Sequence, residues 1–215
     1  MSGIDAVLWD FGGVVTSSPF DAFRRLEQER GLPVDFLRRV NSTNPHANAW
    51  ARMERGEIGP GEFDAMFLEE STALGHPVGG ADVLKLLSGE VRPRMVAAIR
   101  QVRTRYKVAC LTNNMNAGHG PGMAQSSDRA RAIAEVMELF HLVVESSKTG
   151  LRKPEPAFYL HACDQLGIDP ARAVFLDDLG INLKPAAALG MRTIKVTDPD
   201  VALGELGELI GMSFE

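Results

Sequence analysis

Three short apolar runs, each followed directly by polar residues, constrain the fold of this chain more than any other feature. Each run is too short to form an independent helix and lies between helix-like segments. The runs and the polar residues after them are 4–9 with Asp10, 106–111 with Thr112 and Asn113, and 173–176 with Asp177 and Asp178. Such alternation predicts an α/β fold with a doubly wound parallel sheet. Because the carboxyl ends of parallel strands meet at one edge, where ligands bind, we expect these side chains to converge on one cleft.

Asp10 is the first of these candidate functional residues. A carboxylate at the end of a buried strand is costly to desolvate unless something pairs with it. Gly12 and Gly13 follow it and permit a tight turn and a close approach of a ligand to the backbone. Asp10 alone fits a turn or cap residue equally well. The repetition of the pattern at the two later runs favours a functional carboxylate.

The segment between the first two runs predicts a helical insertion. Its helix-like stretches are separated by Gly, Pro and Asn, and no strand pattern occurs among them: 33–40, 47–55, 61–74 and 81–87. Ser18 and Pro19 predict the start of a further helix, which we expect to end at Gly31. We therefore expect a Rossmann-like core formed by 1–17 and 89–215, and a small helical cap formed by 18–88.

Large apolar side chains are frequent in the predicted cap. They are Phe20, Phe23, Trp50, Met53, Phe63, Met66 and Phe67. Apolar residues at helical spacing indicate the hydrophobic core of the cap, and a lipid-binding groove is the alternative.

The segment 146–156 (SSKTGLRKPEP) is a loop between an apolar run at 142–144 and a predicted helix. We expect its glycine and prolines to exclude a helix before Glu155. The loop brings Lys148, Arg152 and Lys153 to the strand edge. A lysine in a loop is commonly a solvated surface charge, but an acidic cleft at this edge requires a cation.

The composition excludes several classes of protein. The 215 residues carry a net charge of −5, which argues against broad nucleic-acid binding. The chain contains no apolar run of about 20 residues and no signal-peptide pattern, so we expect a cytoplasmic protein without a membrane partner. The two cysteines, Cys110 and Cys163, lie among apolar neighbours and are interpreted as core residues. The sequence does not indicate an oligomeric state.

Three carboxylates at one edge repel each other unless a cation neutralises them. Mg²⁺ fits such a site because it binds carboxylates, carbonyl groups, waters and phosphate oxygens. Neither the cysteines nor the five histidines lie in the strand-end motifs, so zinc is not expected. A carboxylate, Mg²⁺, a hydroxyl, an amide and a lysine are the groups that phosphoryl transfer needs. Asp10 can then attack the phosphorus of a bound phosphate ester, and Thr112 and Asn113 can bind the phosphate oxygens. Lys153 and Mg²⁺ would then offset the negative charge.

The combination of motifs resembles the haloacid dehalogenase-like hydrolases. The matching segments are WDFGGVV, CLTNN, GLRKPEP and FLDDLGINLKPA, in this order and over almost the whole chain. Within this family, ESSKTGLRKPEPAFY through FLDDLGINLKPAAALGMRTIKV resembles the N-terminal phosphatase domain of soluble epoxide hydrolase, and MERGEIGPGEF resembles its cap.

The resemblance implies a role for each matching residue. Asp10 is the expected nucleophile, and Thr112, Asn113 and Lys153 are the expected phosphate-binding residues. The expected metal ligands are Asp10, Asp178 and the backbone carbonyl of Gly12. Asp177 is expected beside the metal, and Asn182 is expected to support it through a water. The implied activity is Mg²⁺-dependent hydrolysis of a small organic phosphate.

One position departs from the family pattern. The phosphatases usually carry a second Asp two residues after the nucleophile, as general acid and base, and this chain has Gly12 there. A slow enzyme, a substrate with a good leaving group, or an acid from the cap are the options that this leaves. Two other functions remain as alternatives: a 2-haloacid dehalogenase, which lacks the second Asp but needs no metal, and a catalytically weak binding module.

Overall fold

The computed structural model describes residues 3–120, 122–124 and 126–214. Its centre is a five-stranded sheet in which every pairing is parallel, in the order β3-β2-β1-β4-β5. The strands are β1 (Ala6–Trp9), β2 (Lys107–Thr112), β3 (Leu142–Glu145), β4 (Ala173–Asp177) and β5 (Arg192–Lys195). The three apolar runs form the three central strands, which confirms the predicted α/β parallel sheet.

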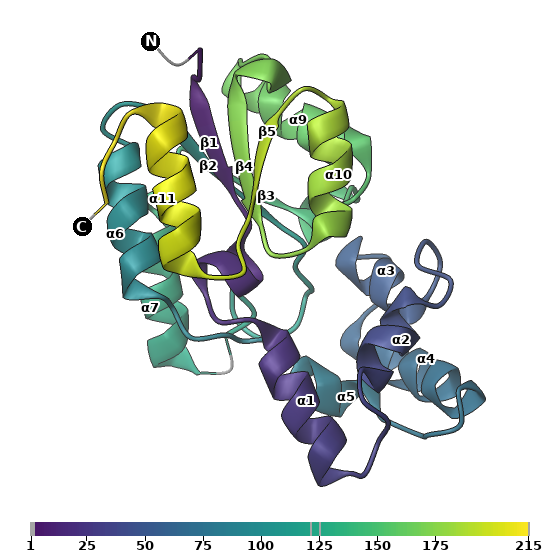
Figure 1. Cartoon of the computed structure of the whole chain (residues 1–215). Coiled ribbons are helices and arrows are strands. Elements are labelled where there is room, and N and C mark those ends of the chain that lie inside the picture. The colour runs from purple at the N-terminus through teal and green to yellow at the C-terminus, as the bar shows by residue number, and fades with distance from the viewer. Residues whose placement is uncertain (1–2, 121, 125, 215) are drawn as a thin grey trace.

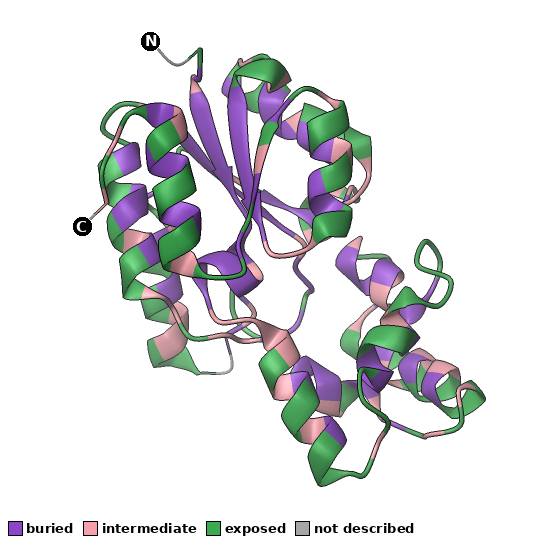
Figure 2. Ribbon diagram, in the orientation of Figure 1, coloured by how far each residue is buried: buried purple, intermediate pink, exposed green. Residues whose placement is uncertain are grey.

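Helices cover both faces of this sheet (Figure 1). One face packs against α6 (Pro93–Val102), α7 (Ser127–Met137) and α11 (Pro199–Ile210), and the other against α9 (Pro156–Leu166) and α10 (Gly180–Ala188). Figure 2 shows that the central strands are buried, except for the exposed first residue of β2, Lys107. Both faces are covered, so the strands read as continuous apolar runs rather than as alternating ones.

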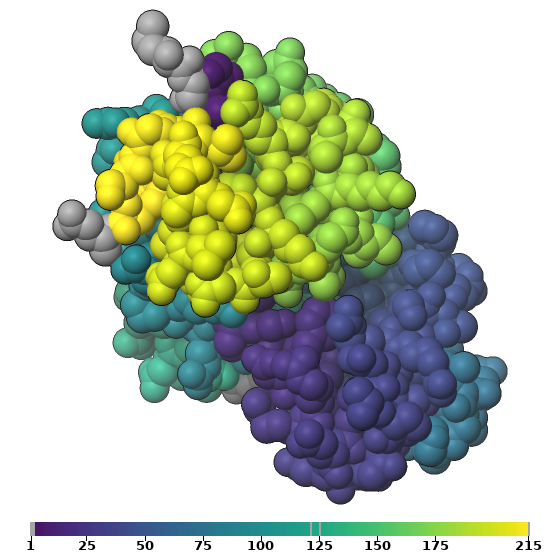
Figure 3. Space-filling model, viewed as in Figure 1, coloured from purple at the N-terminus to yellow at the C-terminus, as the bar shows by residue number. Residues whose placement is uncertain are grey.

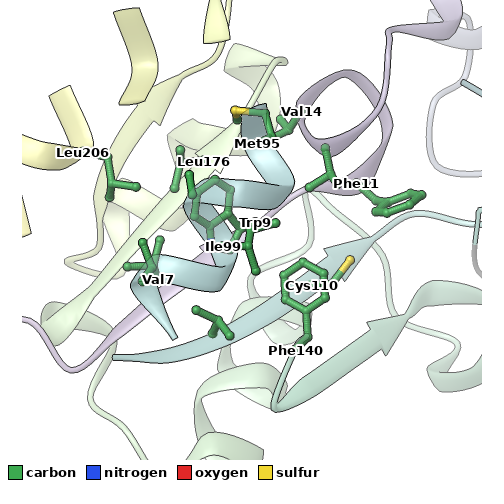
Figure 4. Close-up of a cluster of buried hydrophobic side chains, with 14 of the residues drawn as sticks. Val7, Trp9, Phe11, Val14, Met95, Ile99, Cys110, Phe140, Leu176 and Leu206 are labelled. Carbon is green, nitrogen blue, oxygen red and sulfur yellow. The ribbon is translucent and has the colours of Figure 1, made fainter. Parts of the chain in front are cut away.

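Successive side chains of each central strand enter different hydrophobic clusters. Val7 and Trp9 of β1 belong to the cluster under α6 and α11, which Figure 4 shows in close-up, whereas Leu8 belongs to the cluster under α9 and α10. Cys110 is fully buried in the first cluster and Cys163 in the second. Both cysteines are therefore core residues, as the sequence predicts.

A short irregular turn, η1 (Phe11–Val15), follows β1 and carries the chain away from the sheet. Asp10 caps this turn, since its side chain accepts a hydrogen bond from the backbone N–H of Phe11 at 2.6 Å. Gly13 has a φ of +85°, and a β-carbon built on it would lie 2.2 Å from Oδ2 of Asp178. Only glycine lets this turn approach the end of β4 so closely.

Five helices between η1 and α6 form a separate cluster below the strand ends, visible in purple and blue in Figures 1 and 3. They are α1 (Pro19–Glu29), α2 (Phe36–Ser42), α3 (Ala49–Glu54), α4 (Pro60–Ala73) and α5 (Gly80–Leu84). The α1 helix begins at Pro19, and Ser18 is its N-cap residue, as the sequence predicts. The seven apolar residues singled out above all belong to, or pack against, the core of this helical cap.

The two segments that join the cap to the sheet domain run side by side. Thr16 forms an antiparallel bridge with Val91, and the backbone N–H of Ser17 donates to the carbonyl of Glu90 at 2.8 Å. A β-carbon on Gly89 would lie 2.4 Å from the carbonyl oxygen of Ser17, so the pairing requires glycine there. We propose that this paired connection is the boundary between core and cap.

The loop after β3 differs from the prediction. We expected no helix before Glu155, but residues Ser146–Thr149 form a single helical turn, α8. Gly150 ends this turn in a left-handed conformation with a φ of +72°. The glycine and prolines that prevent a longer helix all lie after the turn, and the buried Ser146 hydroxyl anchors it by donating to the carbonyl of Asn114 at 3.1 Å.

Across the described ranges, none of the helices combines the length and the apolar character that crossing a membrane would require.

Gly13→Ala should lower the free energy of unfolding by about 1–3 kcal/mol, because the new methyl group meets the Asp178 carboxylate and the backbone is strained at positive φ. Gly12→Ala is the matched control. Gly12 has a φ of −70°, and no atom lies within 4 Å of a β-carbon built there. Urea denaturation of both variants tests this, and equal stability of the two would contradict the assignment.

Candidate active site

A cavity of about 570 Å³ lies between the cap and the carboxyl ends of the central strands. The core contributes Asp10, Gly12, Thr112, Asn113, Lys153, Asp178 and Asn182 to its wall. The cap contributes Phe20, Arg38, His46, Trp50 and Glu54, among others. Seven of the eight residues predicted as site residues thus line one cavity. The eighth, Asp177, is fully buried and pairs with Lys153.

Asp10 lies where β1 ends and η1 begins. Its backbone N–H donates to the carbonyl of Leu176 at 2.8 Å, which ties this point to β4. Its Oδ1 atom accepts from the backbone N–H of Phe11 and lies 2.7 Å from Nζ of Lys153. These contacts fix the orientation of the carboxylate at the wall of the cavity.

Lys153 supplies the positive charge that the carboxylates at this edge of the sheet need. Its side chain is 1% exposed, and Nζ lies 2.7 Å from Asp10 and 2.9 Å from Asp177. Burial by itself would lower the pKa of this amine, but the two carboxylates outweigh it and raise the pKa well above its usual value. For Asp10, burial raises the pKa, Lys153 opposes this, and the charges of Asp177 and Asp178 add to it.

Asp177 is fully buried, and its hydrogen bonds are directed into the protein. Besides Lys153, it accepts from the backbone N–H of Leu179 at 2.8 Å and from Nδ2 of Asn182, which lies 3.1 Å from each carboxylate oxygen. Asn182 therefore contacts Asp177 directly. The carbonyl of Asn182 in turn accepts from the Tyr159 hydroxyl at 2.7 Å.

Asp178 is the carboxylate that faces the cavity. Burial, followed by the negative charge of Asp177, raises the pKa of Asp178 to about 6. Ser18, at the start of the cap, has its hydroxyl 3.5 Å from Oδ2 of Asp178. Oxygen atoms from Asp10, Asp177 and Asp178 all lie within 4.8 Å of one another. Carboxylates gathered in this way could hold a hard divalent cation, and the Gly12 backbone lies at the same wall.

Thr112 and Asn113 follow β2 and differ in their surroundings. Within the part of the chain that the structure describes, the Thr112 side chain makes no hydrogen bond, and the residue lines the cavity. The side-chain amide of Asn113 instead binds the backbone of Lys153: Nδ2 donates to its carbonyl at 2.9 Å, and Oδ1 accepts from its N–H at 2.8 Å. The Asn113 side chain thus holds the lysine.

Glu54 of α3 is a cavity residue that the sequence analysis missed. It is buried, and it pairs with Arg152 at 2.6 Å. Glu54 precedes a Gly-containing break in an apolar helix, a pattern typical of a solvated face. The one sequence signal that pointed to Glu54 is its place in the segment MERGEIGPGEF, which resembles the cap of soluble epoxide hydrolase.

The family model for haloacid dehalogenase-like hydrolases matches residues 4–190 of the chain. The mouse acyl-CoA dehydrogenase family member 10 is 34% identical, and pig bifunctional epoxide hydrolase 2 is 30% identical, each over 96% of this chain. The chain spans 19% and 39% of these two longer relatives. A sesquiterpene phosphatase of Aspergillus oryzae is 28% identical over 77% of this chain and 81% of its own length.

Solved structures share the fold. A predicted haloacid dehalogenase-like hydrolase from Porphyromonas gingivalis superposes with a TM-score of 0.68 at 20% identity, covering 98% of this chain and 99% of its own. An enzyme of the same family from Bacteroides thetaiotaomicron, in complex with magnesium and inorganic phosphate, gives 0.57 at 20% identity, with coverages of 89% and 93%. L-2-haloacid dehalogenase from Xanthobacter autotrophicus gives 0.61 at 22% identity, with coverages of 99% and 84%.

The resemblance to soluble epoxide hydrolase is confirmed by the relatives, and the fold by the structures. With the family model matching most of its length, this chain belongs to the haloacid dehalogenase-like hydrolases.

Proposed function

We propose that this chain is a Mg²⁺-dependent phosphatase that cleaves a small organic phosphomonoester. The observation that carries the proposal is the shared cavity, in which the Asp10 carboxylate lies together with Thr112, Lys153 and Asp178. A nucleophile, a hydroxyl donor, an ammonium group and a metal-binding carboxylate are the groups that phosphoryl transfer requires. The phosphatase among the relatives and the magnesium and phosphate bound to a protein of the same fold support it.

Asp10 is the proposed nucleophile. One of its carboxylate oxygens forms a bond to phosphorus while the bond from phosphorus to the substrate's ester oxygen breaks. The alcohol leaves with a proton, and the phosphoryl group stays on Asp10 as an aspartyl-phosphate. A water molecule then attacks phosphorus and loses a proton, which releases inorganic phosphate and regenerates the Asp10 carboxylate.

The other residues bind charge. Asp10, Asp178 and the backbone carbonyl of Gly12 are the proposed metal ligands, and Asp177 and Asn182 support them from behind. Mg²⁺, when bound, supplies positive charge that neutralises the carboxylates and the phosphate oxygens. Thr112 donates its hydroxyl to a phosphate oxygen, and Lys153 offsets negative charge at Asp10. The side-chain amide of Asn113, which was expected to bind phosphate, is bound to the Lys153 backbone, so we propose that it contributes by holding Lys153.

We infer from the family resemblance that Gly12 stands where related phosphatases carry their general acid. We propose that the leaving alcohol takes its proton from solvent, so that substrates with good leaving groups react fastest.

Asp10→Asn should abolish phosphatase activity. The wild-type chain should release p-nitrophenol from p-nitrophenyl phosphate with Mg²⁺ and not with EDTA, and the variant should be at least about a thousandfold slower because the amide is a poor nucleophile. Asp5→Asn is the matched control: Asp5 lies in the same N-terminal segment and pairs with Arg172 on the surface, so its activity should stay within about twofold.

Assays with other substrates separate the two alternative functions. EDTA-resistant chloride release from a 2-haloacid would favour a dehalogenase. Absence of turnover on a panel of sugar, lipid and acyl phosphates, with Mg²⁺ still bound, would favour a binding module.

Gly12→Asp should increase the rate for substrates with poor leaving groups. A β-carbon on Gly12 meets no atom within 4 Å, so the backbone there has room for a substitution. We expect at least a tenfold gain in kcat with an alkyl phosphate, within the ~10²–10⁴-fold range of general acid catalysis, and little change with p-nitrophenyl phosphate. Gly12→Asn, which has the same shape without the acid, should show no gain. A gain in Gly12→Asn, or none in Gly12→Asp, would contradict the role proposed for this position.

Mg²⁺ affinity should fall as the pH decreases through about 6. In the metal-free protein burial raises the pKa of Asp178 to about 6 and also raises that of Asp10, so protons compete with the metal below these values. Mg²⁺ affinity is therefore highest above the raised pKa values of these carboxyl groups. Below them it weakens by up to about tenfold per pH unit for each proton that Mg²⁺ must displace. Titration calorimetry from pH 5 to 8 measures this, and Asp178→Asn should make the dependence less steep, with the contribution of Asp10 remaining. A constant affinity in the wild-type chain would contradict it.

A further inference from the structure

We propose that Glu54 of the cap is a positioning residue, which orients Asn113 and, through it, Lys153 when the cap is seated on the core. The inference rests on the proposed phosphatase function for its effect on turnover. The geometry that points to it is a continuous line of contacts from α3 of the cap to the Asp10 carboxylate.

The Glu54 carboxylate binds donors from both sides of the cavity. From the cap, Nε1 of Trp50, one turn earlier on α3, donates to Oε1 at 2.8 Å. From the core, Nε of Arg152 lies 2.6 Å from Oε2, and Nδ2 of Asn113 lies 3.2 Å from the same oxygen. Glu54 is 6% exposed, so these contacts are made away from bulk water. A carboxylate in this setting selects one arrangement of its donors, because each unpaired group would be costly.

Asn113 passes this constraint to Lys153. One hydrogen of its Nδ2 is directed to Glu54 and the other to the carbonyl of Lys153, while its Oδ1 accepts from the N–H of the same lysine. Both backbone polar groups of Lys153 are therefore bound by one side chain. The amide cannot rotate without losing all three contacts. The Nζ atom of Lys153 then reaches Asp10 at 2.7 Å.

Arg152 gives the cap a second contact on the same loop. Besides Glu54, it donates from NH1 to the carbonyl of Pro45 at 3.1 Å, in the segment between α2 and α3. A buried ion pair adds little net stability, because desolvation of both charges offsets their attraction. The Glu54–Arg152 pair can therefore determine the position of the cap on the core while adding little to the stability of the closed arrangement, which suits a cap that must open to release product.

A neighbouring ion pair provides the control. Arg55, the next residue along, lies 3.4 Å from Glu155 of the core and also donates to the carbonyl of His46 at 2.7 Å. This pair joins the same two parts of the protein, but no hydrogen bond or ion pair links either residue to Asn113 in the described structure. Arg55→Gln therefore weakens the seating of the cap without removing the Glu54 contact to Asn113.

The experiment compares Glu54→Gln, Asn113→Ala, the double variant and Arg55→Gln, all as the full chain with p-nitrophenyl phosphate and Mg²⁺. We expect Glu54→Gln to lower kcat at least about tenfold with KM within about threefold, because a small displacement of Lys153 weakens charge stabilisation. In the Asn113→Ala background Glu54→Gln should have no further effect on kcat, and Arg55→Gln should retain kcat within about twofold. Additive losses, or an equal loss in Arg55→Gln, would overturn the proposal.

Hydrogen exchange gives a readout that does not depend on turnover. Lys153 donates its backbone N–H only to Asn113 within the described structure, so Glu54→Gln should accelerate exchange of the Lys153 amide itself by about tenfold, and Arg55→Gln should not. If the wild-type chain hydrolyses no phosphate, the proposed function fails and this measurement still decides the coupling. Unchanged exchange in Glu54→Gln would overturn the coupling even in an active enzyme.

Discussion

The rest of the site depends on the ion pairs that the buried ammonium group of Lys153 forms with Asp10 and Asp177. A parallel sheet brings acidic residues from β1 and β4 to the same edge, where burial raises the pKa of Asp10 and would drive it toward the neutral form. Lys153 opposes that tendency. Breaking a buried pair of this kind by removing one partner typically costs about 3–5 kcal/mol, because the remaining charge has no compensation. The sheet, the loop after β3 and the turn after β1 therefore depend on one another.

The two adjacent carboxylates after β4 have different surroundings. Asp177 is fully buried, and its oxygens accept from Lys153, from Asn182 and from the backbone N–H of Leu179, which precedes α10. Asp178 faces the cavity and contacts Ser18 at the start of the cap. One carboxylate thus maintains the interior of the site and the other is available to a ligand. Gly13 makes the arrangement possible, since any larger residue would occupy the space of the Asp178 carboxylate.

The cap is linked to this centre as well as covering it. Its own hydrophobic core also includes Met115 and Ala117, which belong to the loop after β2, so apolar packing extends across the boundary. Phe20 and Trp50 contribute both to this core and to the cavity wall. Glu54 and Arg152 add a charged contact beside the proposed phosphate site. Seating the cap and completing the surroundings of Lys153 are therefore the same structural event.

Local sequence determined much of this protein. Apolar patterns over a few residues predict the three central strands, and Ser18 with Pro19 predicts the start of α1. The general rule that parallel strands end at one edge of a sheet predicts that Asp10, Thr112 and Asp178 converge. The side-chain partners were decided only by the tertiary structure. Asn113 binds the backbone of a residue 40 positions away, and Glu54 pairs with one 98 positions away. No local pattern encodes such distances, because they arise when separately folded elements pack and each buried polar group must find a partner.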